Sequence, residues 1–148
     1  MRTSPRSIIT IDLAAVRHNV AFLRQKLRLG TRFLAAVKAD AYGHGGSECA
    51  RVAMQAGADG VGVATAEEAV ALRDGGFTAP ILVMGPLFSR DQYLEMASRG
   101  VEYAIVSEEM ASMICSFSSL RPKGRVHLKI DSGMNRQGLN PDRVPAFL

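Results

Sequence analysis

The feature that most limits how this chain can fold is a strict alternation of short apolar runs with amphipathic segments. The runs are centred near residues 36, 63, 83, 105 and 128, so 20 to 27 residues separate each from the next. Each interval has room for one helix, and runs that are apolar on both faces are typical of parallel strands covered by helices. We therefore expect an α/β fold with right-handed crossovers, either an open doubly wound sheet or part of a (β/α)₈ barrel.

Capping signals divide the alternating pattern into elements. Residues 7–11 predict a short strand, and Asp12 is positioned to cap a helix whose apolar residues recur at spacings of three and four. Residues 65–68 form a capping box, Ser107 is expected to cap a later helix, and residues 140–142 to begin a last one. Residues 1–148 are thus expected to form one domain or part of a larger one, with a leading strand in 1–12 and strand–helix units in 13–148.

Composition and charge exclude several classes of protein. Lys and Arg outnumber Asp and Glu by 18 to 14, and the excess is scattered, which gives no support for nucleic-acid binding and fits a small anionic ligand. No apolar run approaches the roughly 18 residues of a membrane helix, and no signal segment follows the basic start, so a cytoplasmic protein is expected. Cys49 and Cys115 are too few and too far apart for a disulfide framework or a metal clip.

The last apolar run carries three ionisable residues on one face. In a strand over 125–131, His127, Lys129 and Asp131 point the same way, and a glycine-bracketed loop over 132–138 then presents Arg136. Inward charges are costly unless they are paired or used. An edge strand with one solvated face explains the same pattern, so both readings stay open on these residues.

Lys38 ends an otherwise apolar strand, at the carboxyl end where parallel sheets hold their ligands. A lysine among apolar groups is a good nucleophile because its charged form is disfavoured, and this is what a Schiff base with a carbonyl cofactor requires. A lysine that snorkels to solvent is the alternative. The glycine-rich turn over 42–46 follows the lysine and lacks the ending of a nucleotide-binding loop, and His44 is expected to be a turn residue.

Two segments together carry a resemblance to a known family. Residues 36–45, Ala-Val-Lys-Ala-Asp-Ala-Tyr-Gly-His-Gly, resemble the pyridoxal-phosphate attachment motif of the alanine racemases, enzymes of fold type III. Residues 127–138 resemble that family's second motif, about ninety residues further on, in the family's order and spacing. The resemblance implies a homodimer whose subunits have an N-terminal (β/α)₈ barrel and a C-terminal β domain. A full barrel needs about 250 residues, so we expect here the first five or so βα units of it, with the C-terminal β domain missing.

The resemblance also implies roles for individual residues. Lys38 matches the lysine that holds pyridoxal 5'-phosphate as a Schiff base and then acts as a base. Tyr42 matches a tyrosine that contacts the cofactor phosphate, and Arg136 an arginine that faces the cofactor oxygen and the substrate carboxylate. Lys129 matches a lysine that is often carbamylated in the family, a modification that would pair it with Arg136, and His127 and Asp131 are expected to support the site. Asp40, Ser132 and Gln137 depart from the commonest residues of the two motifs.

The implied reaction is the interconversion of L-alanine and D-alanine by α-proton abstraction, which supplies D-alanine for peptidoglycan. The family's second base is a tyrosine of the partner's C-terminal domain, and neither Tyr42, Tyr93 nor Tyr103 has a matching context, so this chain alone is expected to be inactive. The residues leave the choice among small amino-acid substrates open. The alternatives are a related fold type III decarboxylase or aldolase, a non-catalytic pyridoxal-phosphate-binding barrel, and an open-sheet binding module without cofactor.

Overall fold

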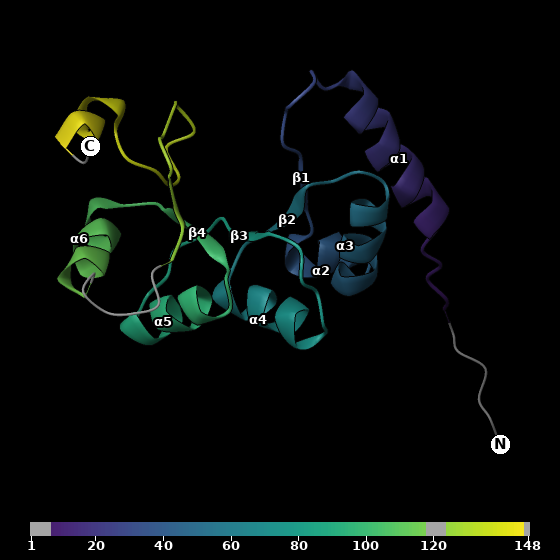
Figure 1. Ribbon diagram of the computed structural model, residues 1–148, viewed down its shortest axis with the longest axis horizontal. Helices are drawn as coiled ribbons and strands as arrows, with labels where there is room; N and C mark the ends of the chain where they lie inside the picture. Colours follow the sequence, from purple (N-terminus) through teal and green to yellow (C-terminus); the bar gives the residue numbers. More distant parts are fainter. Residues whose placement is uncertain (1–6, 118–123, 147–148) are drawn as a thin grey trace.

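The computed structural model describes residues 7–117 and 124–146, which form a curved parallel sheet with helices along its outer side (Figure 1). The strands are β1 (Leu34–Ala36), β2 (Gly60–Val63), β3 (Ile81–Val83), β4 (Glu102–Ile105) and β5 (Val126–Leu128). The helices are α1 (Leu13–Lys26), α2 (Lys38–Gly43), α3 (Gly46–Gln55), α4 (Ala66–Asp74), α5 (Arg90–Ser98) and α6 (Glu108–Ser116), followed by a 3₁₀ helix (Pro141–Ala146).

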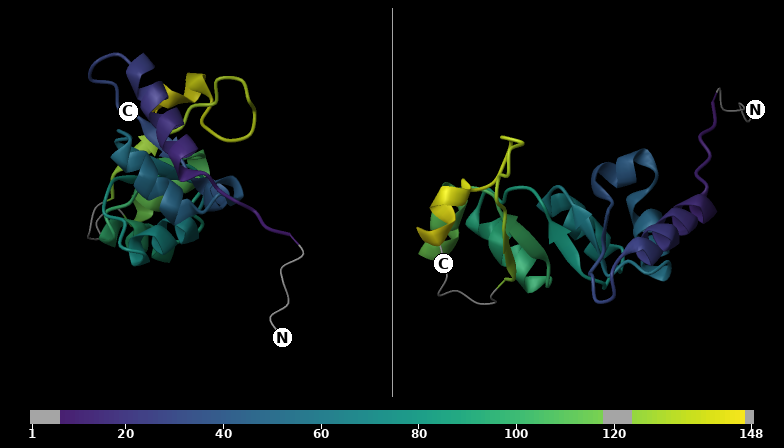
Figure 2. Two further views of the ribbon diagram at one scale, coloured as in Figure 1. Left: turned by 90° about the vertical axis from the view of Figure 1, so that its right-hand side faces the viewer. Right: turned by 90° about the horizontal axis from the view of Figure 1, so that it is seen from above.

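The strand order decides between the two α/β architectures. The sheet runs β1-β2-β3-β4-β5, and every neighbouring pair is parallel. A doubly wound sheet reverses its strand order at a switch point, whereas a barrel adds each strand beside the previous one. Figure 1 shows the helices following one another around the outer side of the strands, and the right-hand view of Figure 2 shows the successive units side by side, as in a segment of a barrel. The predicted α/β class and the barrel-type arrangement are confirmed.

The core lies between the sheet and the helices around it. All four residues of β2 are buried, and Val61, Ile81 and Tyr103 are among the largest side chains that are fully buried. On the other face of β2, a Cβ at Gly62 would lie 3.1 Å from the sulfur of Met84. Glycine at this position therefore lets the Met84 side chain lie directly over the strand.

Hydrogen bonds at the helix starts confirm the predicted caps. Asp12 Oδ1 accepts from the backbone N–H groups of Ala14 (2.8 Å) and Ala15 (3.1 Å). Thr65 and Glu68 form the predicted capping box of α4, and Ser107 Oγ accepts from the N–H of Met110 at the start of α6. Such caps satisfy N–H groups that have no partner inside the helix.

Three predicted elements need correction. Residues 7–12 form no strand, so the predicted leading strand is wrong over the described part of 1–12, and Ile8 and Ile9 are 78% and 86% exposed because no neighbouring strand covers them. The strand predicted over 125–131 is shorter, with only an isolated bridge between Ile130 and Leu139 beyond β5. The helix predicted from 140–142 is a 3₁₀ helix, at whose start Asn140 Oδ1 accepts from the N–H of Asp142 (2.9 Å).

Both outer strands have an open edge among the described residues, since β1 pairs only with β2 and β5 only with β4. Val126 and Ile130, at the β5 end of the sheet, are 49% and 45% exposed. Open parallel edges and exposed apolar residues favour pairing with another chain. We therefore expect the 148-residue chain, made by itself, to self-associate.

This expectation is checked by light scattering on the size-exclusion peak of the isolated chain. Val126→Lys should reduce the association, because a lysine on an edge strand opposes strand pairing. Ser112→Lys, on the exposed side of α6, adds the same charge away from the edge and should leave the association unchanged. A wild-type chain that is monomeric at all concentrations contradicts the expectation.

Candidate active site

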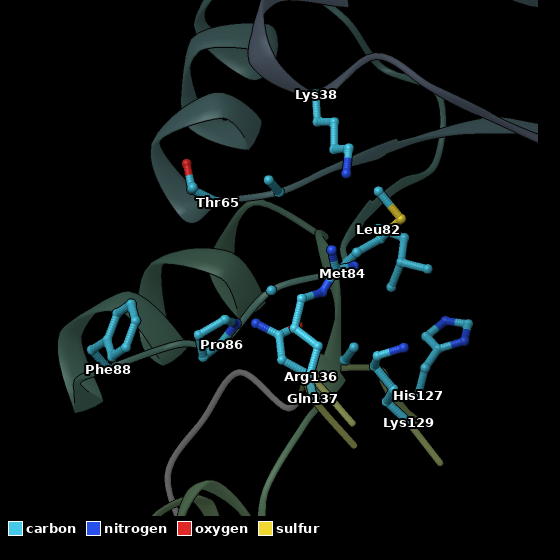
Figure 3. Close-up of a pocket in the computed structure, with 13 residues that line it drawn as sticks. Lys38, Thr65, Leu82, Met84, Pro86, Phe88, His127, Lys129, Arg136 and Gln137 are labelled. Atoms are coloured by element: carbon cyan, nitrogen blue, oxygen red, sulfur yellow. The ribbon is translucent and has the colours of Figure 1, made fainter. Parts of the chain in front are cut away.

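A cavity of about 670 Å³ lies at the carboxyl ends of the strands (Figure 3). Its walls come from the turn after β1, from the segments after β2 and β3, from the strands β3, β4 and β5 themselves, and from the loop after β5. The residues that line it are Lys38, Ala64, Thr65, Leu82, Met84, Gly85, Pro86, Phe88, Ala104, His127, Lys129, Arg136 and Gln137. The volume lies within the range of about 300–1,000 Å³ found for small-molecule and cofactor sites.

The ionisable groups that line this cavity, among the described residues, are all basic. Lys38 extends from one wall, while Arg136, Lys129 and His127 lie on the other side (Figure 3). No Asp or Glu lines the cavity, and most of the remaining lining is apolar. Clustered cations against apolar walls attract an anionic ligand, and an arginine matches a carboxylate or phosphate with paired N–H donors. The cavity is therefore suited to a small anion that also offers an apolar or ring-shaped body.

Lys38 begins a backbone turn of unusual conformation. Residues 39–42 all have positive φ angles, from 51° to 56°, so that α2 is a left-handed turn. L-residues in this region cost roughly 1–2 kcal/mol each, so surrounding contacts must hold the turn. Two such contacts come from Asp40, whose Oδ1 accepts from the N–H of Gly46 (2.6 Å) and whose carbonyl accepts from the N–H of Gly45 (2.9 Å).

The structure places Tyr42 on the outside of this turn, where it is 62% exposed and does not line the cavity. Its ring centre is 5.8 Å from Lys38 Nζ, within the range of a cation–π contact. His44 also lies outside the cavity lining, and its Nδ1 is 2.8 Å from the carbonyl oxygen of Ala41, as fits a turn residue. Among the motif residues 36–45, Lys38 alone reaches the cavity.

The strand β5 and the residue after it bring two of the three predicted ionisable groups to the cavity. His127 and Lys129 line it, as expected for alternate residues of one strand face. Asp131 does not line it: its Oδ1 accepts from the N–H groups of Gly133 (2.9 Å) and Asn135 (3.1 Å), which hold the pKa of this carboxyl below its usual range. These bonds shape the loop that carries Arg136 to the cavity.

Glu102 contacts the site and was not predicted from the sequence. Its Oε2 is 2.7 Å from Nε2 of His127 on the adjacent strand, and its side chain is only 14% exposed. The hydrogen bond with His127, followed by Arg125, holds the pKa of the Glu102 carboxyl below its usual range. The sequence does carry a sign of this residue, because Glu102 is a charged residue in the otherwise apolar run 102–106, just as Lys38 is in its own run.

Within residues 7–117 and 124–146, no three His, Cys, Asp or Glu side chains gather closely enough to hold a metal ion. Over the same residues, every helix is too short or too polar to cross a membrane.

Comparison with known proteins bears on what this cavity is for. The sequence profile described as alanine racemase, N-terminal domain, matches residues 11–148. The chain belongs to the alanine racemase family. It is 38% identical to the alanine racemase of Nostoc sp. over 148 residues, which cover 98% of this chain and 38% of that protein. It is 44% identical to the alanine racemase of Xanthomonas campestris over 132 residues, 89% of this chain and 36% of that protein.

Solved structures of alanine racemases have the same fold in the matching region. The enzyme of Bacillus anthracis with bound L-Ala-P matches with a TM-score of 0.83 and 33% identity, over 90% of this chain and 34% of that one. The enzyme of Corynebacterium glutamicum matches with a TM-score of 0.81 and 34% identity, over 92% of this chain and 39% of that one. The five parallel strands thus correspond to the N-terminal barrel of alanine racemases, and the chain spans little more than a third of these relatives.

The Glu102–His127 pair predicts a pH-dependent contribution to stability. Glu102→Gln should lower the free energy of unfolding at pH 7 by about 1–2 kcal/mol, because a charge-assisted hydrogen bond is lost. Since folding lowers the pKa of Glu102, the carboxylate stabilises the fold above its unfolded pKa of about 4.3, and this contribution is lost as the pH falls through the folded value.

The contribution of the Glu102 carboxylate to stability is measured by urea unfolding of wild type and Glu102→Gln. The measurements run from about pH 3 to about pH 8, a range chosen to bracket the carboxyl pKa. The difference between the two proteins should shrink below about pH 4. Glu48→Gln, which affects an exposed ion pair with Arg51, should cost under about 0.5 kcal/mol at every pH. A Glu102 effect that is constant across the range argues against the pair.

Proposed function

We propose that this chain is part of an alanine racemase that interconverts L-alanine and D-alanine with pyridoxal 5'-phosphate held by Lys38. The observation that carries the proposal is the opposition of the Lys38 amine to Arg136 and Lys129 across one cavity without acidic lining. Membership of the alanine racemase family favours racemase activity over a decarboxylase, an aldolase or a non-catalytic pyridoxal-phosphate-binding barrel.

The residues present fit this cofactor chemically. The aldehyde of the cofactor needs an amine, its phenolic oxygen needs a cation, and its ring needs apolar walls. The cavity offers Lys38 as the amine, Arg136 as the cation, and Leu82 and Met84 as apolar walls. When bound, pyridoxal phosphate supplies an electron sink that lowers the barrier to removal of the α-proton. Tyr42, exposed beside Lys38, is proposed to contact the phosphate.

The protein's own side chains bind the substrate, orient its α-carbon and move its α-proton. The Lys38 amine, in its free form, would be the base that takes the α-proton on one face of the substrate. Arg136 binds the substrate carboxylate and so orients the α-carbon toward that amine. Carbamylation of Lys129 would convert it into an anion that neutralises Arg136 and holds it in place. His127 is proposed to support the site from β5, and Asp131 from the loop that carries Arg136.

Racemisation needs a second acid/base group on the opposite face of the substrate. None of the three tyrosines of this chain lines the cavity, since Tyr42 lies outside it and Tyr93 and Tyr103 are 4% and 0% exposed in the core. We propose that the second group comes from the partner subunit of a homodimer and that the 148-residue chain alone is inactive. In the cell the product D-alanine is proposed to enter peptidoglycan, and the enzyme to act in the cytoplasm on alanine or another small amino acid.

Schiff-base formation at Lys38 is tested by incubation with pyridoxal phosphate, reduction with borohydride and peptide mapping. We expect the label on Lys38, because its amine faces the cationic cavity that attracts the phosphate, and no label above background on Lys26 of α1. Lys38→Arg should lose the label and keep the fold as judged by circular dichroism. A folded protein labelled elsewhere and not at Lys38 would falsify the cofactor assignment.

The catalytic role of Lys38 is tested by the rate of alanine racemisation in the intact protein, followed by optical rotation. Lys38→Ala should lower kcat/KM by about 10²–10⁴, the usual contribution of a positioned acid/base group, while Lys26→Ala should match wild type. The isolated 148-residue chain should racemise neither enantiomer. Activity in that isolated chain contradicts the requirement for a second group from elsewhere.

A further inference from the structure

The left-handed turn after Lys38 is held from outside by a carboxylate 29 residues away. Glu68 Oε1 accepts from the backbone N–H of Ala39, the residue directly after Lys38, at 2.7 Å. The other oxygen, Oε2, accepts from the N–H groups of Ala64 (2.7 Å) and Thr65 (3.4 Å) at the end of β2. One side chain thus joins the ends of two neighbouring strands.

This contact lies where the backbone is least favourable. Ala39 is the first of four consecutive non-glycine residues with positive φ, which Gly43 then extends to five, and β1 ends only two residues before Lys38. A hydrogen bond to a charged acceptor is among the stronger ones in proteins. The Ala39–Glu68 bond therefore offsets part of the cost of the turn at the point that sets the direction of the Lys38 side chain.

Glu68 itself does not reach the site. It lines a separate cavity of about 200 Å³, together with Asp40 and Ser47, and it does not line the cavity that Lys38 lines. We infer that Glu68 is a positioning residue, which fixes the Lys38 turn to the end of β2 and thereby holds the amine in the cavity. The effect of Glu68 on catalysis rests on the proposed function, but its hydrogen bonds to the Lys38 turn and to the end of β2 do not depend on that function.

A carboxylate is required for this arrangement, because all three groups that face it are N–H donors. Glu68→Gln keeps the size of the side chain but turns an amide NH₂ toward one of these donors. Glu67→Gln changes the neighbouring carboxylate, whose Oε1 accepts from Gln92 Nε2 (3.1 Å). Ser107→Ala removes the N-cap of α6 and so destabilises the fold without touching the Lys38 turn.

The first measurement is hydrogen exchange of the Ala39 amide in the intact protein without added cofactor. Glu68→Gln should speed this exchange about tenfold, because the amide loses its charged acceptor. Glu67→Gln and Ser107→Ala should leave it at the wild-type rate. Unchanged exchange in Glu68→Gln overturns the inference.

The second measurement separates positioning from general stability. Acetic anhydride acetylates exposed lysines, and the rate at Lys38 is divided by the rate at the exposed Lys26 in the same molecule. In Glu68→Gln the ratio should rise about threefold, since a loosened turn releases the amine toward solvent, whereas in Ser107→Ala it should not change. A ratio that stays constant or falls in Glu68→Gln, even with a lowered Tm, makes Glu68 merely structural and overturns the inference. Neither measurement uses pyridoxal phosphate, so both remain decisive if Lys38 fails to form the Schiff base.

Discussion

Parallel pairing of consecutive strands is the constraint on which the whole site depends. Registers such as Ala36 with Gly62 and Val63 with Val83 bring all carboxyl ends to one edge of the sheet. Because each helix returns the chain to the opposite edge, every segment that follows a strand joins the same rim. Lys38 and Lys129, 91 positions apart in the chain, line one cavity for this reason.

Basic side chains gather at this rim, whereas the three carboxylates of Glu102, Asp131 and Glu68 lie nearby but do not line the cavity. Glu102 pairs with His127, Asp131 binds N–H groups of its own loop, and Glu68 binds the backbone at two strand ends. Each carboxylate is therefore occupied, and none neutralises Lys38 or Arg136. An anion that enters the cavity gains this unbalanced attraction, and its binding in turn stabilises the folded state.

The sequence predicted much of this arrangement where a local rule applied. Apolar runs, the caps at Asp12 and Ser107, and the box of Thr65 and Glu68 are read from neighbours in the chain, and the structure confirms them. The strand over 7–11 was wrong because an apolar run forms a strand only when another strand pairs with it. Glu102 was missed because its partner, His127, lies 25 residues away, and the long-range bond of Glu68 was hidden behind its local role as a cap.

The sequence by itself determined the α/β class, the family and the identity of the groups that can do chemistry, because these follow from periodicity and from motif residues within short stretches. Only the tertiary structure decided which of those groups meet. Lys38, Lys129 and Arg136 line one cavity, Tyr42 lies beside the Lys38 amine and outside the cavity, and Asp131 shapes a loop. The physical reason is that side-chain direction depends on strand register and on the backbone angles of individual turns, here the left-handed residues 39–42, which the packing of distant segments imposes.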